Sequence, residues 1–212
     1  MNKRPALVTD RRFYDFVKRY AFNLDAFAAH VCGHDVLLKQ AIAFTRIERL
    51  GTRSELHESV PPDRDVKQLA QAPDTVAIVA LWQLLTCHES NTYIAVTSRR
   101  KWAELLAPAL RRMLENIANG PHGWIADHVV VTQDTLYVRD RRATWFITHR
   151  IARAAQPEAL AGTCGQYLLW IIHDAHEVSE RCHAVIRGAL TYECGRLLET
   201  VTKVQTHPQN GE

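Results

Sequence analysis

Residues that could carry chemistry follow the most apolar segment of the chain, LLWII at 168–172. The next positions hold His173, Asp174, His176, Glu177, Cys182 and His183. Carboxylates are ligands for Mg²⁺, whereas imidazoles and thiolates are ligands for Zn²⁺. The spacing fits neither HExxH nor HxxEH, and the adjacent residues 182 and 183 would point to different faces of a helix. We therefore predict polar side chains at the carboxyl end of a strand, without a bound metal; a zinc site is the alternative.

The cysteines of the chain do not form a recognisable framework. There are five of them, with irregular spacing and no CxxC pair. This pattern fits a reducing compartment better than a disulfide-stabilised secreted protein. Cys164 follows the loop segment ALAGT, but no His/Asp arrangement can be assigned to it, so we do not expect it to be a nucleophile.

Basic residues occur in short runs that could contact DNA phosphates. The candidates for nucleic-acid contacts are Arg99, Arg100, Arg111 and Arg112. The chain has 26 Lys and Arg residues against 23 Asp and Glu residues, which gives a formal net charge of +3. Because acidic residues are interleaved with the basic ones, a solvated surface is the favoured interpretation, and DNA binding is the alternative.

Alternating helices and strands must position these residues. Residues 10–50 have helical spacing, and residues 51–65 are polar with a Pro-Pro pair, as in a loop. Beyond them the pattern predicts a buried helix over 74–85, a strand over 91–96, a helix over 102–117 with a possible kink at Pro108, a hairpin over 128–138, a strand over 143–147, a loop or short helix over 151–165, a strand over 168–172, a helix over 182–190 and a strand over 196–204. This order predicts an α/β fold with a mostly parallel, helix-covered sheet.

The length and composition predict one compact unit. We expect a small helical preface over 1–58 and a core over 59–212. The first residues lack the apolar region of a signal peptide, and no apolar run approaches the roughly 20 residues that a membrane span needs. We therefore expect a cytoplasmic protein that does not bind membranes.

The order of these segments resembles the ATPase domain of terminase large subunits, the motors that package DNA into the heads of tailed phages. The matching stretches are ALWQLLTCHESNTYIAVTS (80–98), NGPHGWIADHVVV (119–131), ATWFI (143–147), PEALAGT (157–163), LLWIIHDAHEVSERCHAVIRGALT (168–191) and THPQNG (206–211). The resemblance implies a P-loop NTPase fold of the ASCE class. It places Gln40 where the family has an adenine-contacting glutamine. A nuclease domain follows in the family, and we expect none here.

The phosphate-binding loop of that family is not recognisable in this chain. Such a loop needs glycines whose backbone N–H groups surround the phosphates, a Lys for the β- and γ-phosphates, and a Ser or Thr for Mg²⁺. No glycine lies between Gly51 and Gly120. Two alternative alignments place the loop at 60–65 or at 72–75, and the residues near these positions are Asp63, Lys67, Asp74 and Thr75. Carboxylates there would repel polyphosphate, so we predict no nucleotide and no cofactor.

The acidic motif of the family is altered as well. The family ends its central strand with an Asp that binds Mg²⁺ and a Glu that activates water, and this chain has His173 and Asp174 there. Imidazole is a poor ligand for Mg²⁺, and Asp174 is one carbon shorter than the expected base. In the other register Asp174 is the metal ligand, and Ala175 cannot act as a base. Neither register gives an intact pair.

The two altered motifs together predict a phage- or prophage-encoded pseudo-ATPase that acts by binding another protein. The expected partner is a terminase subunit, a portal or a host protein, in the cytoplasm of the bacterial host. One alternative is an active ATPase domain of a packaging terminase with unusual motifs. The second alternative is a DNA-binding accessory protein.

Overall fold

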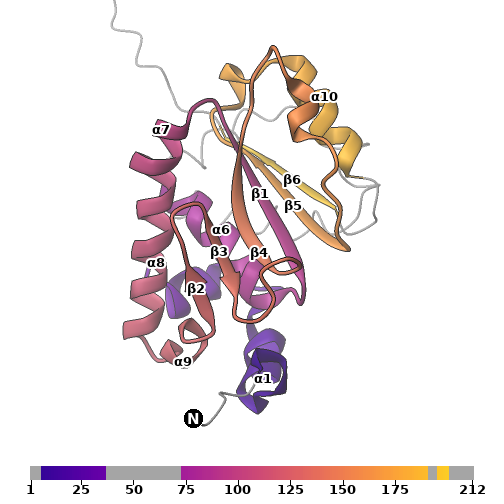
Figure 1. Ribbon diagram of the computed structural model, residues 1–212. Helices are drawn as coiled ribbons and strands as arrows, with labels where there is room; N and C mark the ends of the chain where they lie inside the picture. The colour runs from indigo at the N-terminus through magenta and orange to yellow at the C-terminus, as the bar shows by residue number, and fades with distance from the viewer. Residues whose placement is uncertain (1–5, 37–72, 191–194, 201–212) are drawn as a thin grey trace, which may run out of the picture.

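The computed structural model describes residues 6–36, 73–190 and 195–200 (Figure 1). Six strands of this part form one sheet in the order β2-β3-β4-β1-β5-β6. Their bounds are β1 Ser90–Val96, β2 Val129–Val131, β3 Thr135–Val138, β4 Phe146–Ile151, β5 Tyr167–Ile172 and β6 Arg196–Glu199. β4, β1, β5 and β6 pair in parallel, and the hairpin β2–β3 adds two antiparallel pairings. The predicted α/β fold with a mostly parallel sheet is confirmed.

Two helices cover one face of the sheet. They are α6 (Pro73–Thr86) and α8 (Ala107–Asn119), and α6 is buried from Thr75 to Thr86. Helix α1 (Arg11–Tyr20) packs on α6, and its Phe13, Phe16 and Tyr20 enter the same core. Two buried indoles fix this packing, because Trp82 Nε1 donates to Tyr20 O at 2.8 Å and Trp145 Nε1 donates to Leu84 O at 2.7 Å.

The other face of the sheet is covered by α10 (Glu180–Ala189) and the short 3-10 helix η4 (Pro157–Leu160) (Figure 1). Here the ring of Tyr93 stacks on that of Trp170 and meets Phe146 edge-on. Because β5 is buried on both faces, it needs the continuous apolar run that the sequence contains. The polar residues after this run are thereby carried to the edge of the sheet.

A long helical segment follows β1. It begins with α7 (Arg99–Lys101), capped by the Ser98 side chain, continues through a π-helical turn at Trp102–Leu106, and ends with α8. Pro108 lies in the first turn of α8, where its ring nitrogen cannot donate to the preceding turn, and the wider π turn lies directly before it. The expected distortion at Pro108 is thus a π-helical turn.

Shorter elements complete the described residues. They are η1 (Leu7–Thr9), α2 (Leu24–Ala26), the π-helical η2 (Phe27–Val31), α9 (Gly123–Ala126) and η5 (Ala175–Glu177). None of the helices in the described residues is long and apolar enough to cross a membrane.

Two predicted boundaries were wrong. The strand expected over 143–147 is β4, which begins three residues later, because residues 143–145 form a turn in which Thr144 N and Trp145 N both donate to Arg141 O. The last described strand ends at Glu199 rather than at 204, and Val201 onward lies outside the described residues. The predicted helical region 37–50 and the loop 51–65 also lie outside them. The division at residue 58 stays a prediction.

Candidate functional site

The residues singled out after the apolar strand lie at the carboxyl edge of the parallel strands. β1 and β5 are neighbours, and Ala95 stands opposite Ile172 in their register. The helical segment after β1 lies on one face of the sheet, and α10 after β5 lies on the other (Figure 1). In open α/β sheets, ligand sites form outside the carboxyl ends of strands at such a point. This edge is therefore the candidate site.

The centre of the site is an ion-pair network on Lys101. Its Nζ lies 2.6 Å from Asp174 Oδ2 and 2.7 Å from Glu177 Oε2. Thr97 Oγ1 donates a further hydrogen bond to Glu177 Oε2 at 3.1 Å. The side chain of Asp174 is 7% exposed and that of Lys101 is 24% exposed, so this pair is largely shielded from water. One ammonium thus holds two carboxylates at the end of the central strands.

The network shifts the pKa values of Lys101 and Glu177. Burial by itself would lower the pKa of Lys101, but the hydrogen bonds to Asp174 and Glu177 outweigh it and raise that pKa. The hydrogen bond from Lys101 lowers the pKa of Glu177 below its ordinary value. Both directions favour the charged forms at neutral pH. The site therefore contains its own cation.

His173 is part of the packing beneath this network. Its ring is buried, its Nδ1 lies 3.1 Å from Thr200 Oγ1, and its Nε2 lies 3.6 Å from Asp174 Oδ2. Burial lowers the pKa of His173. The positive charge of Lys101 also lowers this pKa, whereas the negative charge of Asp174 raises it. Asp174 itself has φ +55°, and its backbone N–H donates to Thr200 Oγ1 at 3.3 Å. The left-handed turn directs its carboxylate back toward Lys101, at a conformational cost that the contacts must offset.

The other members of the predicted polar cluster do not converge. His183 lies 3.1 Å from Ala175 O through Nε2 and 3.2 Å from Glu199 Oε1 through Nδ1. Cys182 Sγ donates to Arg153 O at 3.5 Å, and His176 is exposed. Within the described residues, no group of three or more His, Cys, Asp and Glu side chains could hold a metal ion.

The start of α6 holds the second set of predicted site residues. Asp74 lies in the first turn of α6 and forms an ion pair with Arg112 of α8. A carboxylate at this position interacts favourably with the positive end of the helix dipole. Thr75 is buried, with 1% exposure. The other predicted positions, Gln40, Asp63 and Lys67, lie outside the described residues.

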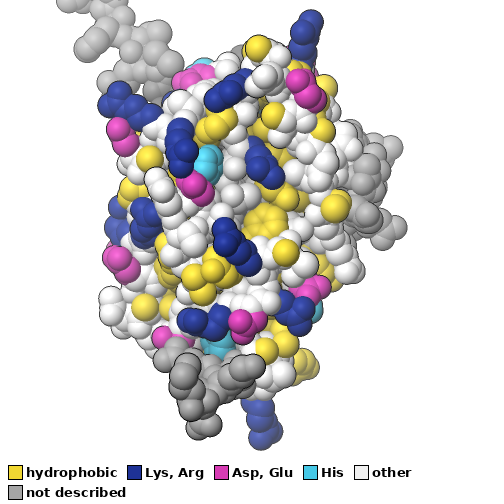
Figure 2. Space-filling view, viewed as in Figure 1, with side chains coloured by type: hydrophobic (Ala, Val, Ile, Leu, Met, Phe, Trp, Pro, Cys, Tyr) yellow, Lys and Arg dark blue, Asp and Glu magenta, His cyan; other side chains and the backbone are white. Residues whose placement is uncertain are grey.

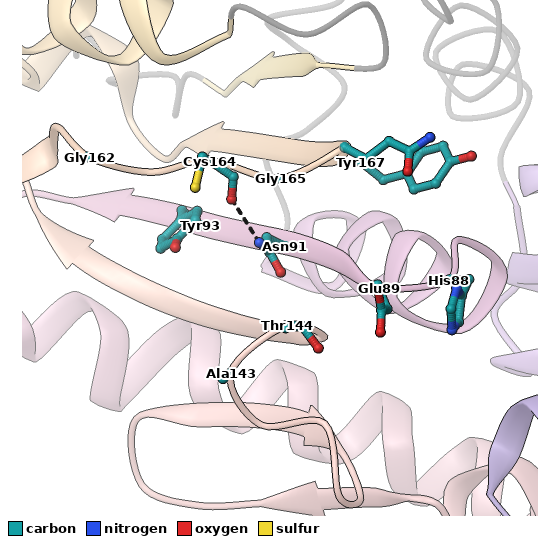
Figure 3. Close-up of a pocket in the computed structure, with 11 residues that line it drawn as sticks. His88, Glu89, Asn91, Tyr93, Ala143, Thr144, Gly162, Cys164, Gly165 and Tyr167 are labelled. Atoms are coloured by element: carbon teal, nitrogen blue, oxygen red, sulfur yellow. Dashed lines mark hydrogen bonds between the residues drawn. The ribbon is translucent and has the colours of Figure 1, made fainter.

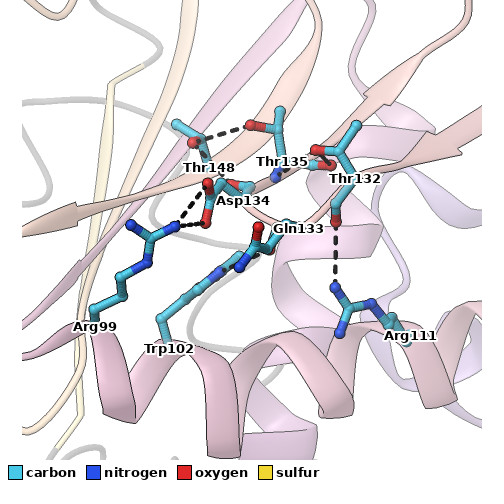
Figure 4. A network of polar contacts seen from close by, with 8 residues as sticks. All are labelled: Arg99, Trp102, Arg111, Thr132, Gln133, Asp134, Thr135 and Thr148. Carbon is cyan, nitrogen blue, oxygen red and sulfur yellow. Dashed lines mark hydrogen bonds and ion pairs between the residues drawn. The ribbon is translucent and has the colours of Figure 1, made fainter.

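The arginines proposed for DNA contact all have acceptors within the chain. Arg99 pairs with Asp134 at 3.2 Å, Arg100 pairs with Glu104 at 2.8 Å, Arg111 donates to Thr132 O at 3.3 Å, and Arg112 pairs with Asp74. Arg99 and Arg111 belong to a network that also contains a hydrogen bond from Trp102 Nε1 to Gln133 O, and it ties the helical segment to the β2–β3 turn (Figure 4). These arginines therefore have a structural role, and their contact with DNA stays a prediction.

A cavity of about 540 Å³ lies at the opposite edge, near the amino ends of β4, β1 and β5 (Figure 3). Cys164 and Tyr167 line it, together with Asn91 and Tyr93 of β1. Asn91 Nδ2 donates to Cys164 O at 2.9 Å, which fixes the loop before β5. This cavity is separate from the Lys101 network, because it lies at the other end of the same strands.

Gly165→Ala is expected to lower the free energy of unfolding by about 1 kcal/mol, because a partly buried hydrogen bond is broken. A Cβ at residue 165 would lie 2.7 Å from Asn91 Nδ2, so the amide must move away from Cys164 O. Gly188→Ala in α10 is the matched control, since its Cβ would meet no atom within 4 Å. Urea unfolding of both variants should show a loss for the first and no loss for the second. Equal midpoints would contradict this account of the loop.

The sequence interpretation missed the residues that complete the site. Lys101 follows Arg99 and Arg100 in one basic run, and the sequence pattern predicts no site role for it, for Thr97 or for Thr200. A usable signal existed, because Lys101 lies shortly after the end of a strand that is parallel to the strand carrying Asp174. The carboxyl ends of adjacent parallel strands meet at one edge of a sheet.

Comparison with known proteins relates part of this chain to a phage protein. A stretch of 75 residues is 33% identical to a protein described as "Probable terminase, large subunit" from Enterobacteria phage P7. The chain is similar to a phage terminase large subunit. The matching stretch is 35% of this chain and spans 15% of the length of the P7 protein. No protein-family model matches the chain.

Proposed function

We propose that this protein is a terminase-related pseudo-ATPase that acts by binding another protein. The observation that carries the proposal is the network in which Lys101 neutralises Asp174 at the end of the central strand. The similarity to the P7 terminase large subunit supports the relationship with packaging motors. The P-loop NTPase fold, the phage origin and the bacterial cytoplasm as location are parts of this proposal.

The Lys101 network opposes metal-dependent chemistry at this edge. A Mg²⁺ ion needs near-octahedral oxygen ligands and usually keeps several waters. Here Asp174 Oδ2 and Glu177 Oε2 both contact the Lys101 ammonium, which carries three N–H donors and no acceptor. A divalent cation that used these oxygens would have to displace the lysine and would be repelled by its charge.

The start of α6 opposes phosphate binding in the same way. The backbone N–H groups at a helix N-terminus attract anions, and the Asp74 carboxylate already lies in this first turn. Its charge is paired with Arg112. The absence of glycine between residues 51 and 120 removes the flexible backbone that a phosphate-binding loop requires. Groups of the protein itself would thus occupy both the metal-binding and the phosphate-binding positions of a nucleotide site.

Isothermal titration with ATP and Mg²⁺ tests the loss of nucleotide chemistry. We expect no heat of binding at millimolar ATP and no phosphate release above buffer. The Lys101→Met variant serves as a comparison, because it removes the competing ammonium. Micromolar binding with turnover that Asp174→Ala abolishes would refute the proposal in favour of the active-ATPase alternative.

Affinity purification from the phage-carrying host tests the partner. A terminase subunit or a portal is the expected partner in packaging, and a host protein is the expected partner if the fold has been recruited for another purpose. Recovery of neither a terminase component nor any stoichiometric host protein would contradict the binding role. No described contact favours DNA binding, because the four candidate arginines are engaged within the chain.

A further inference from the structure

Helix α1 has one buried face and one exposed face. Phe13, Phe16 and Tyr20 enter the core, whereas residues 11, 14, 15 and 18 are exposed on the opposite side. Tyr14 is 72% exposed, and Phe22, which follows at helical spacing, is 83% exposed. These two values are the highest among the large hydrophobic side chains that are exposed in the described residues. We call Arg11, Tyr14, Lys18 and Phe22 the α1 stripe.

Capping hydrogen bonds order the backbone that carries the two aromatic side chains. Asp10 caps α1 through a hydrogen bond from Arg12 N at 3.0 Å. After the helix, Asn23 N donates to Tyr20 O at 3.2 Å, and the Asn23 side chain caps α2 by accepting from Ala26 N at 2.9 Å. Phe22 therefore lies in a short turn between two capped helices. Little backbone entropy at these positions therefore remains to be lost when a partner binds.

The charge of the α1 stripe is positive and unpaired. Neither Arg11 nor Lys18 forms an ion pair with any residue that the structure describes. Arg12 differs from them, since it pairs with Asp10 at 2.6 Å and lies over the ring of Trp124. Lys and Arg side chains share the surface with apolar side chains at the α1 end of the molecule, which is the lower end in Figure 1 (Figure 2). The stripe thus combines two aromatic anchors with two cations that form no ion pair within the described part of the chain.

We propose that the α1 stripe is a docking surface for a partner protein that presents acidic side chains around an apolar depression. Tyr, Phe and Arg are residues that dominate the binding energy of protein interfaces, and rim charges steer association. Asp15 lies on the same face, one turn after Arg11, so the partner should present one basic residue among its acidic ones to pair with it. This inference rests on the proposed function, which assigns a protein partner, and it names the surface that would meet it.

A synthetic peptide tests the surface directly. The probe is a fluorescent amphipathic peptide with leucine and tryptophan on one face and glutamate on the other. We expect fluorescence anisotropy to show binding to the whole chain that weakens as salt rises. The double variant Tyr14→Ser/Phe22→Ser should lose about tenfold in affinity. Lys18→Glu should weaken binding most at low salt.

Leu105→Ser provides the matched control, because Leu105 is an exposed helical side chain (43%) away from α1. It should bind the peptide like the unaltered chain, and all variants should keep the same thermal midpoint. Equal affinity of the double variant, or no binding of the peptide, would overturn the proposal. Displacement of the peptide by duplex DNA of arbitrary sequence would also overturn it, in favour of a nucleic-acid surface. The peptide assay and the ATP titration are independent measurements, so either proposal can be refuted while the other stands.

Discussion

Lys101→Met should lower the free energy of unfolding by about 3 kcal/mol, because it removes a close ammonium group from a buried carboxylate. Asp174 is 7% exposed in its side chain and receives its charged contact from Lys101 Nζ at 2.6 Å. Methionine keeps the unbranched stem of lysine but has no N–H donor. Glu177 is 42% exposed and can turn toward water, so the loss arises mainly at Asp174. Urea unfolding at neutral pH measures it.

Two further variants separate charge from packing. Lys101→Arg keeps the positive charge, so it should be more stable than Lys101→Met. It should be less stable than the unaltered chain, because the planar guanidinium places its N–H donors differently from the lysine ammonium. Arg100→Ala should cost only a few tenths of a kcal/mol, since its i,i+4 pair with Glu104 is exposed. A Lys101→Met variant as stable as the unaltered chain would mean that Asp174 is hydrated or protonated, and it would remove the main support for the pseudo-ATPase proposal.

Acidification from pH 7 to pH 5 should destabilise the fold through its buried and partly buried histidines. Burial lowers the pKa of His173, and it also lowers the pKa of His122, His128 and His149. Above the unfolded value of about 6.5, both states are neutral and stability is complete. Below this value the histidines of the unfolded chain bind protons, whereas those of the folded chain stay neutral. The free energy of unfolding therefore falls until the pH reaches the folded pKa. The loss for His173 alone is up to about 1.4 kcal/mol per pH unit.

Asp10 and Glu177 titrate at lower pH than these histidines, so they do not contribute to the change between pH 7 and pH 5. Hydrogen bonds from Arg12 and Lys101 lower the pKa of Asp10 and of Glu177, so their stabilisation is present above the unfolded values of about 4 and is lost only below them. His173→Gln should flatten the dependence between pH 7 and pH 5, as measured by urea unfolding at each pH. The exposed His176→Gln is the control. An unchanged slope in His173→Gln would show that this imidazole is not buried in its neutral form.

The sequence by itself determined the class of fold and the elements that carry the site. The apolar run at 168–172 could only be a strand buried on both faces, and the apolar helix at 74–85 could only be covered on all sides. Such patterns predict burial, because apolar side chains favour removal from water wherever the fold places them. The resemblance to terminase large subunits was also visible without coordinates, and the partial match to the P7 protein supports a terminase-like relationship.

The tertiary structure alone decided which charges meet. Lys101 looked like one more member of a basic surface run, yet it lies in the first turn after β1 and reaches Asp174, 73 residues later in the chain. Arg112 reaches Asp74 across 38 residues in the same way. Ion pairing depends on distances of a few ångströms between side chains from separate elements, and sequence spacing does not encode such distances. The register of parallel β1 and β5 brings their carboxyl ends together, and this places Lys101 beside Asp174, the residue that the sequence had already singled out.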